Sequence, residues 1–215
     1  MYKPFKYEEE KFNLKLEKDV YYIVRFDGKD MTKDYKINKE PINEEFFKTM
    51  KETFYSFCSS KKNIIFAYSF SDEISILIKG PKNSTIEEAR IEKILSLYAG
   101  ELSILFFKNA QNNRLNTTKN NVFDARIIQT SSIYEYFISR QAFAIDKFIM
   151  QLKGKFNIDY KLHTSNKVLK ELEKKGIKYN EFPAEYRYGL IYNSKEKLES
   201  FEFQAQPLKL KKLLN

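Results

Sequence analysis

The chain alternates short apolar runs with longer amphipathic segments. Four runs are rich in β-branched and aromatic side chains, which predicts strands over residues 20–26, 64–69, 74–78 and 122–129. The amphipathic segments repeat large apolar residues at helical spacing, which predicts helices over residues 43–59, 84–105, 132–152 and 166–175. A late strand is expected over residues 188–192. No internal repeat interrupts this pattern.

Local signals mark where these helices begin. Asn43, followed by two glutamates, is typical of a helix N-terminus. Ser84–Glu87 and Ser132–Glu135 each match the capping box, in which a serine and a glutamate three residues later bind exposed backbone amides. Gly100 lies inside the second predicted helix and costs about 1 kcal/mol relative to alanine, which predicts a break or a close packing contact there.

The order of the elements indicates an α+β fold. Strand, helix, strand, strand, helix, strand is the split βαβ pattern of ferredoxin-like domains. Its sheet order, fourth–first–third–second, places the first strand antiparallel to the third and brings Asp27 beside Asp72 at one edge. We assign residues 1–152 to this domain and residues 153–215 to a small C-terminal α/β extension packed on it. The last residues, from about 207, are expected to form a mobile, solvated tail.

Composition favours an anionic partner. The chain has 215 residues and a formal net charge of +9, and such a basic excess favours nucleic acid over a membrane surface. No apolar run approaches the roughly 18 residues that a membrane span needs. Cys58 stands alone in a predicted helix, which excludes a disulfide framework and favours a small buried side chain. We therefore expect a reduced, cytoplasmic protein.

The candidate chemistry lies in the turn Ser71-Asp72-Glu73, between two predicted strands, and in Asp27 at the end of the first strand. Burying neighbouring carboxylates costs several kcal/mol unless cations neutralise them, and Mg²⁺ is a hard ion that prefers such oxygen ligands. The alternative is that these are simply favourable turn residues. The convergence of Asp27 and Asp72 favours the metal, because paired acids that hold Mg²⁺ are how nucleotidyl transfer is catalysed.

Five short motifs follow one another along the chain: Arg25–Lys29, Tyr68–Ser75, the helix residues Arg90, Lys93, Ile94 and Ser96, the segment Phe123–Arg126, and the dipeptide Arg140-Gln141. Each is weak alone, but their order and their predicted elements together are specific. Together they resemble the motifs of the histidine-tRNA guanylyltransferase family and its 3′–5′ polymerase relatives. The similarity covers about residues 24–141, with a weaker match over 176–189. It implies the polymerase-palm fold, in agreement with the order of the elements.

For the site, the resemblance implies a two-metal centre. Two Mg²⁺ ions would be held by Asp27, Asp72 and the backbone carbonyl of Gly28, with Glu73 as an adjacent catalytic acid. ATP and GTP would be the substrates, and their triphosphates would contact Lys29, Asp30, Met31, Thr32, Ser71, Arg90 and Lys93. The backbone amides after Gly28 would cradle the phosphates, and the basic side chains would neutralise them. From residue type alone, Arg90 is equally a solvated helix residue and Ser71 a turn hydroxyl.

The chain also departs from the family's motifs. Met31-Thr32 replaces an aromatic–histidine pair, and Ser139 stands where the family has a tryptophan before Arg-Gln. Residues 144–148 read Ala-Ile-Asp-Lys-Phe, where the family has a histidine and paired asparagines. The single histidine, His163, lies outside the motifs and is expected at the surface. These departures leave the metal centre intact but argue against the strict histidine-tRNA specificity.

These features predict a Mg²⁺-dependent nucleotidyltransferase that adds nucleotides to the 5′ end of tRNA or another structured RNA in the 3′–5′ direction. The departures favour a repair or editing role over strict histidine-tRNA guanylylation. By resemblance, a homotetramer or homodimer is expected. One alternative is a palm-domain nucleotidyl cyclase or oligonucleotide synthase that makes a signalling nucleotide from triphosphates alone. The other is a non-catalytic RNA-binding module, which the net charge favours and the clustered acids oppose.

Overall fold

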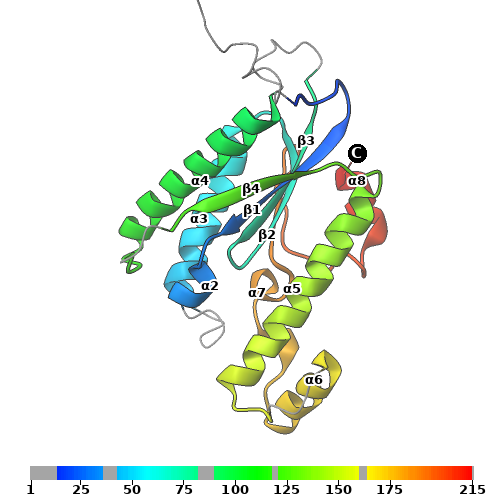
Figure 1. Cartoon of the computed structure of the whole chain (residues 1–215). Coiled ribbons are helices and arrows are strands. Elements are labelled where there is room, and N and C mark those ends of the chain that lie inside the picture. Colours follow the sequence, from blue (N-terminus) through cyan, green and yellow to red (C-terminus); the bar gives the residue numbers. More distant parts are fainter. Residues whose placement is uncertain (1–13, 36–42, 82–89, 118–120, 160–163, 215) are drawn as a thin grey trace, which may run out of the picture.

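An antiparallel sheet of five strands forms the centre of the protein (Figure 1). The computed structural model describes residues 14–35, 43–81, 90–117, 121–159 and 164–214. The strands are β1 (Tyr21–Gly28), β2 (Ile64–Phe70), β3 (Glu73–Lys79), β4 (Phe123–Ile128) and β5 (Leu190–Asn193). Their spatial order is β4-β1-β3-β2-β5. The predicted α+β fold and the predicted order of the first four strands are therefore confirmed, and β5 extends the sheet beyond β2.

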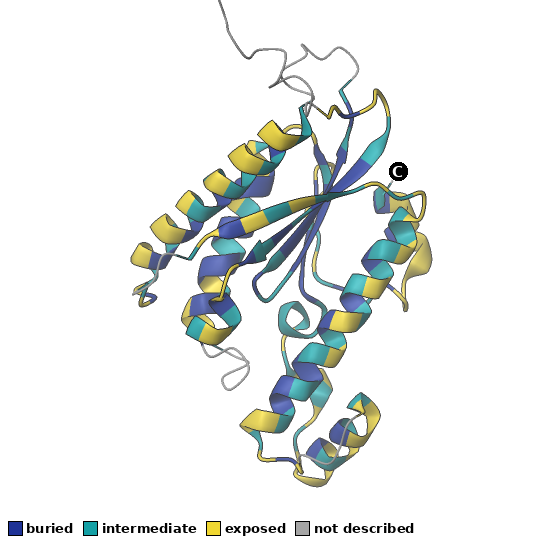
Figure 2. Ribbon diagram, in the orientation of Figure 1, coloured by how far each residue is buried: buried dark blue, intermediate teal, exposed yellow. Residues whose placement is uncertain are grey.

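Helices cover both faces of this sheet. The helices of the described residues are α2 (Met31–Asp34), α3 (Glu44–Ser60), α4 (Ile91–Asn112), α5 (Ile133–Lys155), α6 (Ser165–Lys174), α7 (Ala184–Tyr188) and α8 (Pro207–Leu214), with a 3₁₀ turn at Tyr179–Glu181. One face packs against α3 and α4, and the other against α5 and α8. Figure 2 shows the strands largely buried and the helices exposed on their outer sides.

Alternation along β1 decides which side chains reach each face. Tyr22, Val24 and Phe26 belong to the apolar core shared with α3 and α4, whereas Ile23 belongs to the core shared with α5 and α8. Because successive side chains of a strand point to opposite faces, Asp27 lies on the same face as Ile23. Asp27, the acidic residue of β1, therefore points toward the face of the sheet that α5 covers.

The helix-terminus signals were partly right. The Asn43 side chain accepts a hydrogen bond from the Phe46 amide at 2.9 Å, as expected of an N-cap. Helix α5 begins after Ser132 as predicted, but the Ser132 side chain makes no capping hydrogen bond. Ser84–Glu87 lies outside the described residues. Helix α4 runs unbroken through Gly100, and a Cβ there would meet no atom within 4 Å, so both expectations for this glycine were wrong.

The C-terminal residues differ from the expected mobile tail. Residues Pro207–Leu214 form helix α8, whose Leu210 and Leu213 are buried against β2, β5 and α5. The Asn193 side chain donates a hydrogen bond to the Leu213 carbonyl at 3.1 Å. These two leucines lie three positions apart and so share one face of the helix, which is enough to anchor a single amphipathic helix of this length.

Gln141 fastens the chain before α8 to α5. Its side-chain nitrogen donates to the carbonyls of Tyr188 and Phe201, both at 2.9 Å, and its oxygen accepts from the Phe203 amide. The residue is buried, so these bonds satisfy a polar group that would otherwise destabilise the interior. No helix in the described part of the chain is long and apolar enough to span a membrane.

Leu210→Ala is expected to lower the free energy of unfolding by about 2–5 kcal/mol, because it leaves a cavity in the core between α8 and the sheet. Leu208→Ala is the matched control, since Leu208 is 81% exposed on the same helix and should change stability by less than about 0.5 kcal/mol. Urea unfolding followed by circular dichroism measures both. Equal, small effects would mean that α8 does not pack as the structure shows.

Candidate nucleotide and metal site

The turn between β2 and β3 is held against the end of β1. Ser71 has a left-handed backbone, with φ of 56°, and Phe70 pairs with Glu73 across the turn. Along the other edge of β3, Asp27 pairs with Glu73. Past that pair, the Gly28 amide donates a hydrogen bond to the Asp72 carbonyl at 2.9 Å. The backbone thus fixes Asp72 next to the end of β1.

Gly28 has no room for a side chain. A Cβ at this position would lie 2.4 Å from the Met31 sulfur and 3.1 Å from the Cβ of Asp72. Met31 is fully buried, so it could not move aside without disturbing the core. A glycine here allows the close approach between β1 and the turn, which is the physical reason for the Asp-Gly pair in the motif.

Both aspartates face one narrow cavity between this end of the sheet and α5. Its lining includes Asp27, Asp72, Glu73, Arg140 and Lys147. The structure therefore brings together the three acids that the sequence singled out and adds two cations from α5. Glu73 is tied to one of them: the Arg140 guanidinium donates to both of its carboxylate oxygens, at 2.9 and 2.5 Å. A guanidinium that donates to both oxygens of one carboxylate forms a geometrically specific pair. Both oxygens of Glu73 are therefore already bound by Arg140.

Asp72 is nearly buried and only partly neutralised. The Thr32 hydroxyl donates to its Oδ2 atom at 2.8 Å, and Lys147 Nζ lies 3.9 Å from its Oδ1 atom. Its side chain is 8% exposed. A carboxylate in this position is costly unless a cation faces it.

The surroundings of the Asp27 carboxylate have an excess of negative charge. Burial raises the pKa of its carboxyl above the ordinary 3.8, and the neighbouring carboxylates of Asp72 and Asp124 raise it further, against the opposing effect of Arg126 and Arg25. No side chain of the described residues forms a hydrogen bond or ion pair with the Asp27 carboxylate. A cation placed between Asp27 and Asp72 would relieve this repulsion.

This set of donors fits Mg²⁺. The described residues contain no cluster of three or more Asp, Glu, His or Cys side chains that could hold a metal by themselves. Mg²⁺ does not require one, because it usually binds one or two carboxylates together with substrate phosphates and water. Asp27, Asp72 and the Gly28 carbonyl would supply the protein ligands. Glu73, whose two oxygens are bound by Arg140, would position that arginine and would not itself be a metal ligand.

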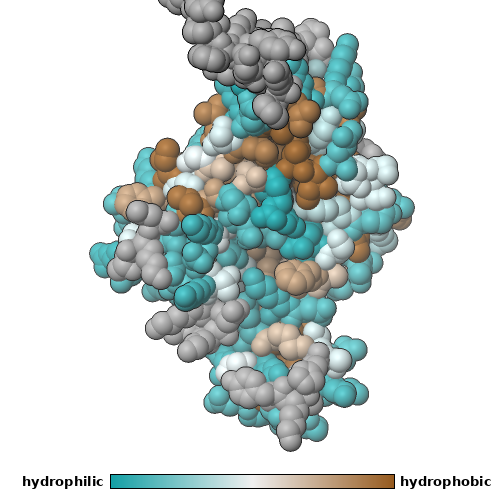
Figure 3. Space-filling model, in the orientation of Figure 1, coloured by the Kyte–Doolittle hydropathy of each residue, from teal (hydrophilic) through white to brown (hydrophobic). Residues whose placement is uncertain are grey.

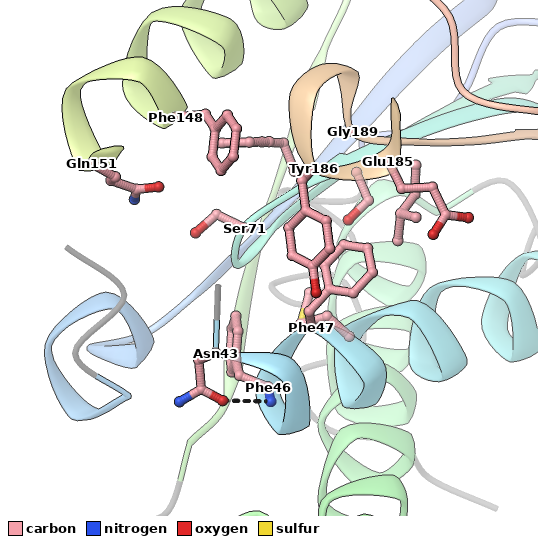
Figure 4. Close-up of a pocket in the computed structure, with 13 residues that line it drawn as sticks. Asn43, Phe46, Phe47, Ser71, Phe148, Gln151, Glu185, Tyr186 and Gly189 are labelled. Carbon is pink, nitrogen blue, oxygen red and sulfur yellow. Dashed lines mark hydrogen bonds between the residues drawn. The ribbon is translucent and has the colours of Figure 1, made fainter. Parts of the chain in front are cut away.

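A second cavity lies on the other side of the same turn (Figure 4). Its lining includes Phe46 and Phe47 of α3, Phe148 and Gln151 of α5, Ser71 of the turn, and Tyr186 and Gly189 near β5. Phe70 lines both cavities. The Phe47 and Tyr186 rings stack with centroids 4.1 Å apart. This cavity is therefore mostly aromatic and adjoins the acidic one.

Two polar atoms in the aromatic cavity lack partners. The Ser71 hydroxyl and the side-chain nitrogen of Gln151 are buried and form no hydrogen bond within the described residues. Figure 4 shows both groups at the side of the cavity beside Phe148, opposite the Phe47–Tyr186 stack. Buried polar groups are normally hydrogen-bonded, so a ligand with a flat ring and polar edges would satisfy them.

The segment after Gly28 is only partly available for phosphates. The Lys29 amide already donates to the Val122 carbonyl at 2.9 Å. Asp30 has a left-handed backbone, with φ of 59°, and precedes the short helix α2, which starts at the buried Met31. The contact of Thr32 with Asp72 is made by its side-chain hydroxyl. The predicted cradle therefore reduces to the amides from Asp30 to Thr32.

Arg90 and Lys93 lie at the opposite end of the sheet. Arg90 bridges to Lys15 and pairs with Glu92, and Lys93 lines a groove with Lys79 and Lys61. Lys79 and Glu73 are the two ends of β3, about 20 Å apart. Within one chain, the structure does not bring these two cations to Asp27 and Asp72. The motif order predicted their helix but not which end of the sheet it begins at.

Among the lining residues given no site role from sequence are Arg140, Lys147, Gln151 and Tyr186. Three of them recur on α5 at positions 140, 147 and 151, the spacing of one helical face. That polar stripe between apolar neighbours was the signal that could have found them. Tyr186 gave no comparable signal. His163 lies outside the described residues.

Comparison with known proteins agrees with this geometry. The family model "Thg1: tRNAHis guanylyltransferase" matches residues 2–131. The chain belongs to this family. Its membership makes the chain a Thg1-like nucleotidyltransferase acting on tRNA 5′ ends. A search of curated proteins finds no match.

Solved structures show the same fold. A bacterial Thg1-like protein in complex with ATP has a TM-score of 0.84 at 21% identity, covering 98% of this chain and 97% of that one. A bacterial Thg1-like protein in complex with GTP has a TM-score of 0.76 at 20% identity, with 98% and 96% covered. The Saccharomyces cerevisiae tRNA(His) guanylyltransferase has a TM-score of 0.69 at 21% identity, with 95% and 99% covered.

Asp27→Asn is expected to stabilise the metal-free protein modestly and to abolish Mn²⁺ binding. The raised pKa of Asp27 means that the folded state holds this proton more tightly than the unfolded state. Wild-type stability in EDTA should therefore fall as the pH rises from the ordinary value of 3.8 through the raised pKa, and the Asn variant should lack this fall. Thermal unfolding between pH 4 and 7 measures it. Glu196→Gln, at an exposed residue outside the cavity, should keep the wild-type profile.

Proposed function

We propose that this Thg1-family enzyme uses Mg²⁺ to add nucleotides in the 3′–5′ direction to the 5′ end of tRNA or a related RNA in repair or editing. The observation that carries the proposal is the shared cavity of Asp27 and Asp72 beside an aromatic cavity with unpartnered polar atoms. Two Mg²⁺ ions would be held by Asp27, Asp72 and the Gly28 carbonyl, and when bound they would lower the pKa of the attacking hydroxyl and stabilise charge on the phosphates.

The two cavities divide the work of binding a nucleoside triphosphate. The flat aromatic cavity takes the base, since its rings offer stacking surface and its free polar groups can pair with the edge of a base. The acidic cavity takes the phosphates together with the metal. Phe70 lines both, so a single nucleotide can extend from one to the other. The ATP- and GTP-bound relatives support ATP and GTP as substrates.

The departures from the family's motifs support a repair role. Residues 144–148 lack the family's histidine and paired asparagines, and within this stretch Lys147 lines the acidic cavity and Phe148 the aromatic cavity. The substitutions therefore change the nucleotide site itself and not only a distant RNA contact. A site altered in this way suits a broader choice of RNA and nucleotide than strict guanylylation of histidine tRNA.

An RNA surface and an assembly are also proposed. Asp124 and Arg126 form an exposed ion pair at 3.0 Å on β4, and Figure 3 shows a hydrophilic area in the middle of this face, beside α5. We propose that RNA approaches here, next to Asp27. The homodimer or homotetramer expected from the family is supported by exposed apolar side chains along one side of α4, namely Leu97, Ile104 and Phe107.

Asp72→Asn is expected to lower nucleotide transfer at least about 10³-fold, because it removes several kcal/mol of metal-dependent transition-state stabilisation. The assay combines 5′-monophosphorylated tRNA, ATP, Mg²⁺ and each labelled triphosphate in turn, and follows label in the RNA. Glu196→Gln, at an exposed residue outside both cavities, should retain wild-type activity.

The same assay without RNA tests the alternative. A cyclic or oligomeric nucleotide product, seen by mass spectrometry from triphosphates alone, would support a signalling enzyme instead. If the wild-type enzyme and the Asp72→Asn variant produced equal amounts of labelled RNA, that result would contradict the metal site.

A further inference from the structure

Lys147 holds an unusual place in the acidic cavity. Its Nζ atom lies 3.9 Å from Asp72 Oδ1, closer than the 4 Å of an ion pair but beyond hydrogen-bonding distance. The other oxygen of Asp72 already accepts a hydrogen bond from Thr32. The ammonium therefore attracts Asp72 without being bound to it. Its side chain is 26% exposed, so it retains room to move.

The neighbouring cation cannot do the same. Arg140, two turns earlier on the same face of α5, is fixed to both oxygens of Glu73. Between them, Ala144 is buried against the sheet, and Phe148 is buried next to Lys147. These contacts anchor the helix, whereas the long side chain of Lys147 is not fixed by a hydrogen bond to any of the described residues. Of the two cations that line this cavity, Lys147 is the one that can change partner.

Charge explains why a change of partner matters. Three carboxylates, of Asp27, Asp72 and Glu73, face two cations in the cavity. Without metal, Lys147 is the charge that offsets Asp72. When a divalent ion takes over that role, the ammonium is repelled by the metal and attracted by the phosphates that arrive with it.

We propose that Lys147 is a tethered cation that neutralises Asp72 in the metal-free enzyme and transfers its ammonium to a phosphate of the bound triphosphate when metal occupies the acidic pair. This inference rests on the proposed function. It predicts two effects of opposite sign. Lys147 weakens the binding of metal alone, by competing for Asp72, and strengthens the binding of metal with triphosphate, through a charge-assisted contact.

The test separates these effects with Lys147→Gln, which keeps a polar, slightly shorter side chain but removes the charge. Mn²⁺ titrated into the nucleotide-free protein, followed by electron paramagnetic resonance, should bind about tenfold more tightly than to wild type. A non-hydrolysable GTP analogue with Mg²⁺, followed by calorimetry, should bind about tenfold more weakly. Lys147→Arg should return both affinities toward wild type.

Lys155→Gln is the matched control, since Lys155 is an exposed lysine of the same helix outside the cavity. It should leave both affinities unchanged. Wild-type affinities in Lys147→Gln, or weaker Mn²⁺ binding, would overturn the exchange of partners. A gain in Mn²⁺ affinity without a loss in analogue affinity would overturn the phosphate contact.

The failure of this inference differs from the failure of the proposed function. If wild type binds Mn²⁺ and the analogue, and Asp27→Asn abolishes the first, the metal site stands whatever Lys147 does. If wild type and Asp27→Asn bind Mn²⁺ equally weakly and neither binds the analogue, the metal site itself is wrong. Circular dichroism of each variant excludes unfolding as the cause.

Discussion

The pairing of β1 with β3 is the constraint on which the rest of the site depends. It sets Asp27 opposite Glu73 and lets the Gly28 amide bind the Asp72 carbonyl at 2.9 Å. A shift of one residue would turn Asp27 to the other face of the sheet, away from α5. The apolar alternation along β1 prevents that shift, because Tyr22, Val24 and Phe26 must face α3 and α4. The fold thus stabilises a costly pair of acids through the burial of their apolar neighbours.

This dependence explains what the sequence could predict. Strand order and the meeting of Asp27 with Asp72 follow from local patterns, and both patterns are strong in this chain. The position of α5 over the site depends on packing, so Lys147 and Gln151 were not recognised as lining residues. Helix α8 was missed because its packing depends on a few leucines in a short segment, of which Leu210 and Leu213 are buried. Arg90 and Lys93 were placed by motif order, which says nothing about the end of the sheet at which a helix starts.

The dipeptide Arg140-Gln141 shows how one short motif can serve two purposes. Neighbouring residues of a helix point in different directions, about 100° apart. Arg140 therefore reaches Glu73 in the acidic cavity, while Gln141 binds three backbone groups of the C-terminal segment. The same turn of α5 is therefore tied to the end of the sheet that carries Asp27 and Asp72 and to the chain that leads into α8.

Lys147 and Phe148 likewise point in different directions from the same helix. They are consecutive, yet one lines the acidic cavity and the other the aromatic cavity. In the proposed binding mode, Lys147 would place positive charge near the phosphates and Phe148 would add stacking surface near the base. Charge contacts to phosphates carry no information about the base, and stacking discriminates weakly among bases. The unpartnered polar groups left to contact a base edge in this proposed mode are the Ser71 hydroxyl and the Gln151 amide, so base preference would rest on few contacts.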